Sequence, residues 1–168
     1  KLLDNDHHLL AAPLASLARL LMDQGRLVEA EPLSREALRL RRKSLGDTHP
    51  LVTRSLANLI DILLAQEKFG EAEPLARECL ATRERTMPDD PQTFNSRCLL
   101  SACLLGEQKY PEAEPLLLSG YEGMKQREAR IPPAGKYRLK QAMERLVQLY
   151  EVTNRPEQAA EWKQKLTE

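Results

Sequence analysis

The chain has 168 residues, and 25 Lys plus Arg balance 25 Asp plus Glu to give a formal net charge of zero. This balance provides no electrostatic footprint for nucleic acid or an anionic membrane surface. No apolar run approaches the roughly 18 residues of a membrane-spanning helix, and aromatic residues are only 4% of the chain. We therefore expect a core of Leu and Ala, and neither nucleic acid nor membrane as a partner.

Helical periodicity runs through the sequence. Apolar residues recur at positions i, i+3, i+4 and i+7, which indicates one buried face of an amphipathic helix. The clearest examples are Leu14, Leu17, Ala18 and Leu21, then Leu56, Leu59, Ile60 and Leu63, and later Met143, Leu146, Val147 and Tyr150. The pattern predicts helices near residues 9–24, 28–44, 51–66, 70–86, 93–107, 111–127, 136–153 and 156–167.

A four-residue motif divides these helices into repeats. AEPL begins at Ala30, Ala72 and Ala113, at steps of 42 and 41, and the divergent stretch NRPEQAAEW puts Ala159 in register. Each repeat is then two antiparallel helices joined by a short turn. We expect a single array over 1–168 with repeats at about 9–50, 51–91, 92–133 and 134–168, as a fragment of a longer chain.

Each residue of AEPL has a predicted role. The Ala should lie where the second helix crosses the first, since a small side chain lets two backbones approach. The Glu should favour the positive end of the helix dipole. The Pro fits a first helical turn, where N–H groups lack partners; one or two residues further on, it would remove a backbone bond and bend the helix.

The pattern resembles the tetratricopeptide repeat, in particular the form of about 42 residues found in kinesin light chains and bacterial multi-repeat proteins. The resemblance rests on LASLARLLMDQGRLVEAEPLSREALRLRRKSLGDTHP and on LANLIDILLAQEKFGEAEPLARECLATRERTMPDDP. It implies an all-α, right-handed α-α superhelical solenoid of about four helix-turn-helix repeats. The last repeat lacks AEPL, which fits a terminal cap in which Trp162 covers the final apolar face.

The resemblance also implies a concave groove lined by the first helix of each repeat. Positions off the buried stripe then give the groove residues. They are Arg19, Arg54, Asn58, Asp61, Asn95, Gln141 and Arg145, beside small residues such as Ala15 and Ala57. Arg19 and Asp61 occupy equivalent places on successive first helices, where they can pair. The alternative is that all these residues are ordinary solvated polar side chains.

Other chemistry has little support in the sequence. No phosphate-binding glycine loop, HExxH or GxSxG motif is present, so we expect no enzyme and no cofactor. His7 and His49 stand at equivalent turns, which favours turn chemistry over a metal site. Only Asn58 matches the carboxylate clamp of chaperone-tail-binding repeats, so a C-terminal carboxylate ligand is not expected. The cysteines Cys79, Cys98 and Cys103 form no CxxC and are expected to be reduced, which favours a cytoplasmic location.

The sequence thus predicts a protein–protein interaction scaffold that binds a peptide or protein segment in its groove. Two alternatives stay open. The chain is a non-catalytic regulatory array of a larger bacterial signalling enzyme, or it is a purely structural array that assembles with itself, for example through an apolar N-terminal edge.

Overall fold

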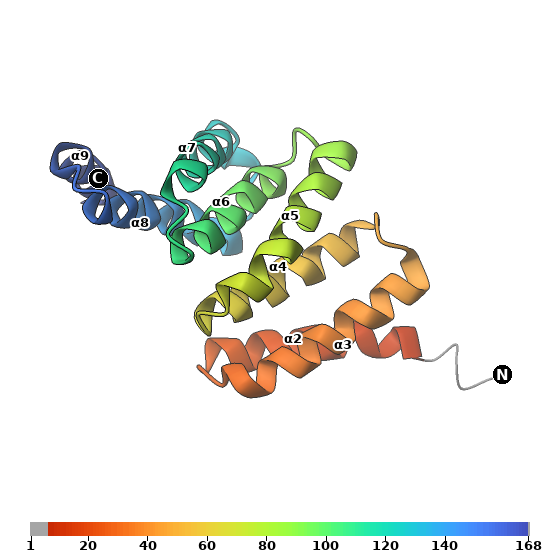
Figure 1. Ribbon diagram of the computed structural model, residues 1–168. Helices are drawn as coiled ribbons and strands as arrows, with labels where there is room; N and C mark the ends of the chain where they lie inside the picture. Colours follow the sequence, from red (N-terminus) through yellow and green to blue (C-terminus); the bar gives the residue numbers. More distant parts are fainter. Residues whose placement is uncertain (1–6, 168) are drawn as a thin grey trace. The chain divides into compact units, whose positions relative to one another are not determined.

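The computed structural model describes residues 7–167, with side chains from residue 9 onward. The described part is helical and contains no strand, which confirms the predicted all-α fold (Figure 1). Every predicted helix end lies within two residues of the observed one. The elements are η1 (His7–Leu10), α2 (Ala11–Asp23), α3 (Leu27–Leu45), α4 (Pro50–Ala65), α5 (Phe69–Thr86), α6 (Pro91–Gly106), α7 (Tyr110–Gln126), η2 (Glu128–Arg130), η3 (Pro133–Gly135), α8 (Tyr137–Val152) and α9 (Pro156–Thr167).

The helices form two compact units, Lys1–Thr82 and Arg83–Glu168, here called unit 1 and unit 2. In unit 1, α2 packs against α3, and α4 packs against both of them. In unit 2, α6 packs against α7, α8 packs against both, and α9 packs against α8. Among residues 7–167, no helix is long and apolar enough to cross a membrane.

Side chains and prolines define where the first helices begin. His49 accepts a hydrogen bond at Nδ1 from the backbone N–H of Leu51, and Asp90 accepts one from Gln92. Pro50 and Pro91 follow these caps at the first helical position, where a missing N–H costs nothing. The structure thus gives His49 the turn role that the sequence predicted, whereas the side chain of His7 lies outside the described residues.

The turn within each repeat contains one residue with a positive φ. Gly25 holds this position in the first turn, and Glu67, Gln108 and Asn154 hold it in the others. In each case the next residue donates its N–H five residues back, as Arg26 does to the carbonyl of Leu21. This is the Schellman arrangement that ends a helix with a left-handed residue. Three non-glycine residues therefore accept some backbone strain to keep the same turn.

The alanine of AEPL is buried at the helix crossing, as predicted. Ala30, Ala72 and Ala113 are fully buried. Ala30 packs in a cluster with Ala18, Leu21 and Ile62, from α2 and α4. The small side chain therefore sits where the helix pair and the following first helix meet.

One predicted core residue is wrong. Leu17 was expected on the buried stripe of α2, but it is 45% exposed, whereas its counterpart Leu59 is 1% exposed. The two have the same register, so the difference lies in their neighbours. α4 has both α2 and α3 before it, whereas only η1 precedes α2 among the described residues.

Unit 2 also packs its helices closely at two glycines of α7. A Cβ at Gly120 of α7 would lie 2.8 Å from the carbonyl oxygen of Phe94 in α6, and the Phe94 ring fills the space beside Gly123. Trp162 of α9 is buried and meets Tyr121 of α7 edge-on at 4.9 Å. The predicted role of Trp162 as a cover for the last repeat agrees with this contact.

The proline of AEPL lies past the first helical turn. The expectation of a first-turn position is therefore wrong, and the alternative, a position slightly further along the helix, is correct. Pro32, Pro74 and Pro115 lie inside α3, α5 and α7, each as the sixth residue. All three are exposed, and so is the residue four positions earlier, whose carbonyl loses its helical partner. Water can reach that side of the helix, so the lost backbone bond is tolerated.

The glutamate of AEPL also has a role other than the predicted one. In unit 1, Glu31 accepts hydrogen bonds from Lys68 Nζ at 2.7 Å, Gln66 Nε2 at 3.0 Å and Arg35 Nη2 at 2.9 Å. Lys68 and Gln66 belong to the turn after α4. Glu31 therefore ties its own helix to the turn of the next repeat and does not act chiefly on the helix dipole.

The same tie recurs in unit 2. Glu114 accepts from Arg155 Nη1 at 2.9 Å and Nη2 at 2.7 Å, and from the hydroxyl of Tyr150 at 3.1 Å. Arg155 stands in the turn before α9. The hydrogen bonds from Arg155, with a smaller contribution from Tyr150, hold the pKa of Glu114 below its ordinary value.

Ala72→Leu should destabilise the chain, because three added carbon atoms have no space at the helix crossing. Overpacking of this kind costs about 1–3 kcal/mol of the free energy of unfolding. Denaturant melts measure the change. Ala81→Leu is the matched control, since Ala81 lies exposed on the same helix. Equal transition midpoints for both variants would remove Ala72 from a close crossing.

Glu31→Gln should lower stability in a pH-dependent way. The hydrogen bond from Lys68, with those from Arg35 and Gln66, lowers the pKa of Glu31 from 4.5 to about 2. A carboxylate with a lowered pKa stabilises the fold above its ordinary pKa and ceases to do so as the pH falls. The difference in free energy of unfolding from wild type should be about 1–2 kcal/mol above about pH 5, reduced by solvent screening, and should disappear towards about pH 2.

Urea melts between these pH values measure this dependence. Glu122→Gln is the control, because Glu122 lies exposed within α7. A pH-independent difference for Glu31→Gln would show that the tie is not ionic.

Candidate functional site

A cavity of about 340 Å³ opens between the helices of unit 1. Three helices line it: α2 through Ala12, Ala15, Ser16 and Arg19, α3 through Arg41, and α4 through Arg54 and Asn58. The residues from α2 are spaced at i, i+3, i+4 and i+7, so they share one face of the helix. The two from α4 are one turn apart.

This cavity brings together part of the predicted groove. Arg19, Arg54 and Asn58 line it, and Ala15 with Ala12 and Ser16 supplies small side chains that leave the space open. Asp61, which was predicted beside them, does not line the cavity. Arg19 Nε donates to Asp23 Oδ1 at 3.0 Å, and the predicted pairing of Arg19 with Asp61 stays a prediction.

The cavity contains one residue that the sequence reading missed. Arg41 comes from α3, the second helix of its repeat, and is only 4% exposed. Its Nη1 donates to Ser55 Oγ at 2.6 Å and to the carbonyl of Leu51 at 3.4 Å, both at the start of α4. Burial, and then the nearby charge of Arg54, lower the pKa of Arg41 from its ordinary value.

A signal for Arg41 was present in the sequence. Arg41 follows Ala37 by four residues and Leu38 by three, so helical spacing places it on the buried face of α3. Arg83 stands 42 residues later and makes the same contacts, to Ser96 Oγ at 2.7 Å and the carbonyl of Gln92 at 2.8 Å. The basic run LRLRRK concealed this position, because charged runs are usually solvated.

The predicted groove residues of unit 2 lie in other surroundings. Asn95 is buried, and Gln141 and Arg145 are half-buried. Gln141 Oε1 accepts from Arg138 at 3.3 Å, and Arg145 Nη1 donates to the carbonyl of Cys98 at 3.3 Å. Gln141 and Arg145 are therefore already engaged within unit 2.

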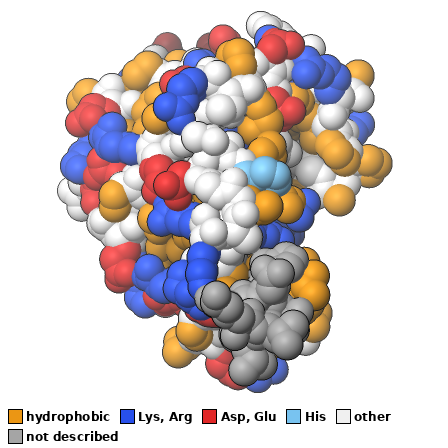
Figure 2. Space-filling model, turned by 90° about the vertical axis from the view of Figure 1, so that its right-hand side faces the viewer, with side chains coloured by type: hydrophobic (Ala, Val, Ile, Leu, Met, Phe, Trp, Pro, Cys, Tyr) orange, Lys and Arg blue, Asp and Glu red, His pale blue; other side chains and the backbone are white. Residues whose placement is uncertain are grey.

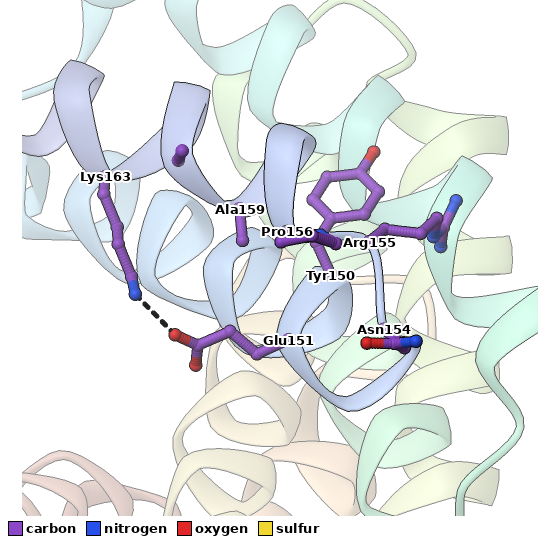
Figure 3. A pocket seen from close by; sticks show the side chains of 8 residues that line it. Tyr150, Glu151, Asn154, Arg155, Pro156, Ala159 and Lys163 are labelled. Atoms are coloured by element: carbon purple, nitrogen blue, oxygen red, sulfur yellow. Dashed lines mark ion pairs between the residues drawn. The ribbon is translucent and has the colours of Figure 1, made fainter.

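A second cavity, of about 270 Å³, lies at the turn between α8 and α9 in unit 2 (Figure 3). The charged groups around it are paired. Lys163 Nζ points toward Glu151 and lies 2.6 Å from its Oε1, while Arg155 binds Glu114 and covers the ring of Tyr150. Its charges are neutralised by partners, which distinguishes it from the cavity in unit 1.

Other chemistry finds no support in the described residues. Basic and acidic side chains are interspersed on the face drawn in Figure 2, without a large patch of one sign. Residues 9–167 contain no group of three or more His, Cys, Asp or Glu placed to hold a metal ion. The three cysteines are buried and free, and burial raises the pKa of Cys98 to about 12, so its thiol stays protonated.

Comparison with known proteins identifies the repeat. A family model described as the tetratricopeptide repeat matches residues 9–85 and 53–126, which together cover most of the chain. No curated protein matches the sequence.

Solved structures share the fold at low identity. A point variant of a putative kinesin light chain with nearly identical TPR-like repeats, from Podosopora anserina, aligns with a TM-score of 0.76 and 20% identity, over 96% of this chain and 74% of that one. BtubC (BKLC) from P. vanneervenii aligns with a TM-score of 0.78 and 21% identity, over 96% of this chain and 63% of its own length. At these identities the likeness establishes the fold alone, a helical-repeat solenoid.

Proposed function

This chain belongs to the tetratricopeptide repeat family, whose members generally mediate protein–protein interaction, and we propose that it binds a segment of a partner protein in the groove of unit 1. The family is a non-catalytic scaffold, so the residues of interest are those that contact a partner. The segment lies along α2 and α4, over the cavity that these helices share with α3.

The cavity itself is the observation that supports this proposal. The α2 side of the cavity has only short side chains at Ala12, Ala15 and Ser16, so a peptide backbone can approach this helix. Asn58 on the opposite wall offers both a donor and an acceptor, which matches the two groups of a peptide bond. Such a site fits the small number of placed polar groups that fix the orientation of a ligand.

Asn58→Ala should weaken a groove-bound peptide by about two- to tenfold, the effect of one or two lost hydrogen bonds. Peptides are first selected from a random display library on the 168-residue chain. Their dissociation constants are then measured for wild type and for each variant by fluorescence anisotropy.

Gln158→Ala is the matched control, because it removes an exposed amide from α9. Circular dichroism confirms that both variants stay folded. If every selected peptide binds both Asn58→Ala and Arg54→Gln as tightly as wild type, the binding surface lies outside this groove.

A second candidate function is self-association. Leu10, Leu17 and Leu20 share one face by helical spacing, and all three are exposed, as is Leu9. Exposed leucines gathered on one helix face often mark a protein–protein contact. We propose that this face forms a contact between copies of the chain or with another protein.

Leu17→Ser combined with Leu20→Ser should shift the chain toward monomer, because the change removes apolar area from that face. Sedimentation equilibrium at several protein concentrations measures the association constant. Val28→Ser is the control, since Val28 is an exposed apolar residue on α3. A wild-type chain that stays monomeric at all concentrations would rule out self-association.

The wider context of the chain and its location in the cell stay proposals. The alternative in which the chain is a non-catalytic regulatory array of a larger bacterial signalling enzyme also stays a proposal. The predicted cytoplasmic location likewise stays a prediction, based on the reduced thiols of three buried cysteines.

A further inference from the structure

We propose that the cavity of unit 1 is an oxyanion subsite, in which Arg41 and Arg54 hold an acidic side chain of the bound segment. The inference rests on the proposed groove function and specifies the chemistry of the partner. The acidic group is internal to the segment and is a carboxylate or a phosphorylated hydroxyl.

The positive charge of Arg41 is buried without a negative partner in the described part of the chain. Its guanidinium is nearly enclosed, yet among the described residues it has no carboxylate partner and only the two neutral acceptors on α4. A buried charge is costly unless it is paired. The adjacent Arg42 shows the usual solution, since its Nη2 lies 2.6 Å from Glu78.

A second positive charge, that of Arg54, faces the same space. Arg54 of α4 lines the cavity and has neither a hydrogen bond nor an ion pair among the described residues. No carboxylate lines the cavity. The chain is neutral as a whole, but this site has two uncompensated guanidinium groups.

The guanidinium groups of Arg41 and Arg54 carry like charges and repel each other. The charge of Arg54 contributes to the lowered pKa of Arg41. An anion placed between them would remove this repulsion and compensate the buried charge.

A purely structural role accounts for the hydrogen bonds of Arg41 Nη1 but not for its Nε and Nη2 groups. Its Nη1 connects α3 to the start of α4, as Arg83 does for α6. The Nε and Nη2 groups of Arg41 have no acceptor among the described residues, and neither is fully enclosed. In Arg83 the Nε is enclosed. One edge of the Arg41 fork is therefore available to a ligand in the cavity.

The chemistry of the ligand follows from this geometry. A guanidinium fork binds planar carboxylates and phosphates through two parallel hydrogen bonds. Two such groups match either a single carboxylate or the greater negative charge of a phosphorylated side chain. Ser16 and Asn58, also on the cavity wall, can donate to the remaining oxygen lone pairs.

The test uses display-selected peptides that bind the 168-residue chain, made with an acetylated N-terminus and an amidated C-terminus so that only side chains supply an anion. Selected peptides should carry an acidic residue at one fixed position. Replacing it with its amide should weaken binding about ten- to hundredfold, the range of a charge-assisted hydrogen bond. Versions with Glu, Asp or phosphoserine at that position identify which oxyanion the site prefers.

Arg54→Gln is the deciding variant, because Arg54 is exposed and its replacement should leave the fold intact. It should reduce the affinity ratio between the acidic peptide and its amide partner toward one. Arg85→Gln, the same change at an exposed position of α5, should leave that ratio unchanged. Arg41→Gln is measured as well, provided that circular dichroism shows it folded.

The outcomes separate the two proposals. Peptides that depend on Asn58 but show no preference for an acidic residue would overturn the oxyanion subsite and leave the groove proposal standing. An acid preference that Arg54→Gln does not reduce would also overturn it. If no selected peptide depends on Asn58 or Arg54, the groove proposal fails, and the subsite with it.

Discussion

The close approach of two helices at a buried alanine is the constraint on which each repeat depends. Ala30, Ala72 and Ala113 are fully buried where a second helix crosses its neighbours. Once this residue faces inward, helical geometry fixes the directions of the next ones. In two copies the glutamate that follows, Glu31 or Glu114, bonds to the next turn. The proline after it is exposed to solvent, where a missing hydrogen bond is tolerated. In AEPL the buried alanine makes the packing contact, and helical geometry then sets the directions of the glutamate and the proline.

Sequence reasoning succeeded where the signal is periodic. The helix positions follow from a spacing of 3.6 residues, and the buried alanines follow from the step between repeats. The structure confirms the helix positions and the burial of the alanines. Sequence reasoning failed where the exposure or the bonding partner of a residue depends on which other helix or turn packs beside it. Leu17 and Leu59 share a register, yet among the described residues only Leu59 has a helix pair before it. The partner of Glu31 lies 37 residues away, in a turn whose position relative to α3 emerges only when the repeats stack.

The cavity shows the same limit. Residues on one helix face, such as Ala12, Ala15 and Arg19, could be grouped from their spacing alone. Arg41 comes from a different helix, and its place in the cavity depends on how α3 packs against α4. Spacing did place Arg41 on the buried face, but charge argued for the surface. The two indications conflict, and such conflicts are where functional residues are most often found.

A repeat protein acquires specificity through positions that differ between copies, because the shared positions are needed for stacking. The positions of Arg41 and Arg83 illustrate how small the difference can be. Both arginines connect a second helix to the next first helix through a serine and a backbone carbonyl. Arg41 also faces an open space that it shares with a second arginine, Arg54. A contact that stacks the repeats can therefore also present part of a guanidinium fork to a ligand, and in the proposed subsite the second positive charge, that of Arg54, favours an anion as this ligand.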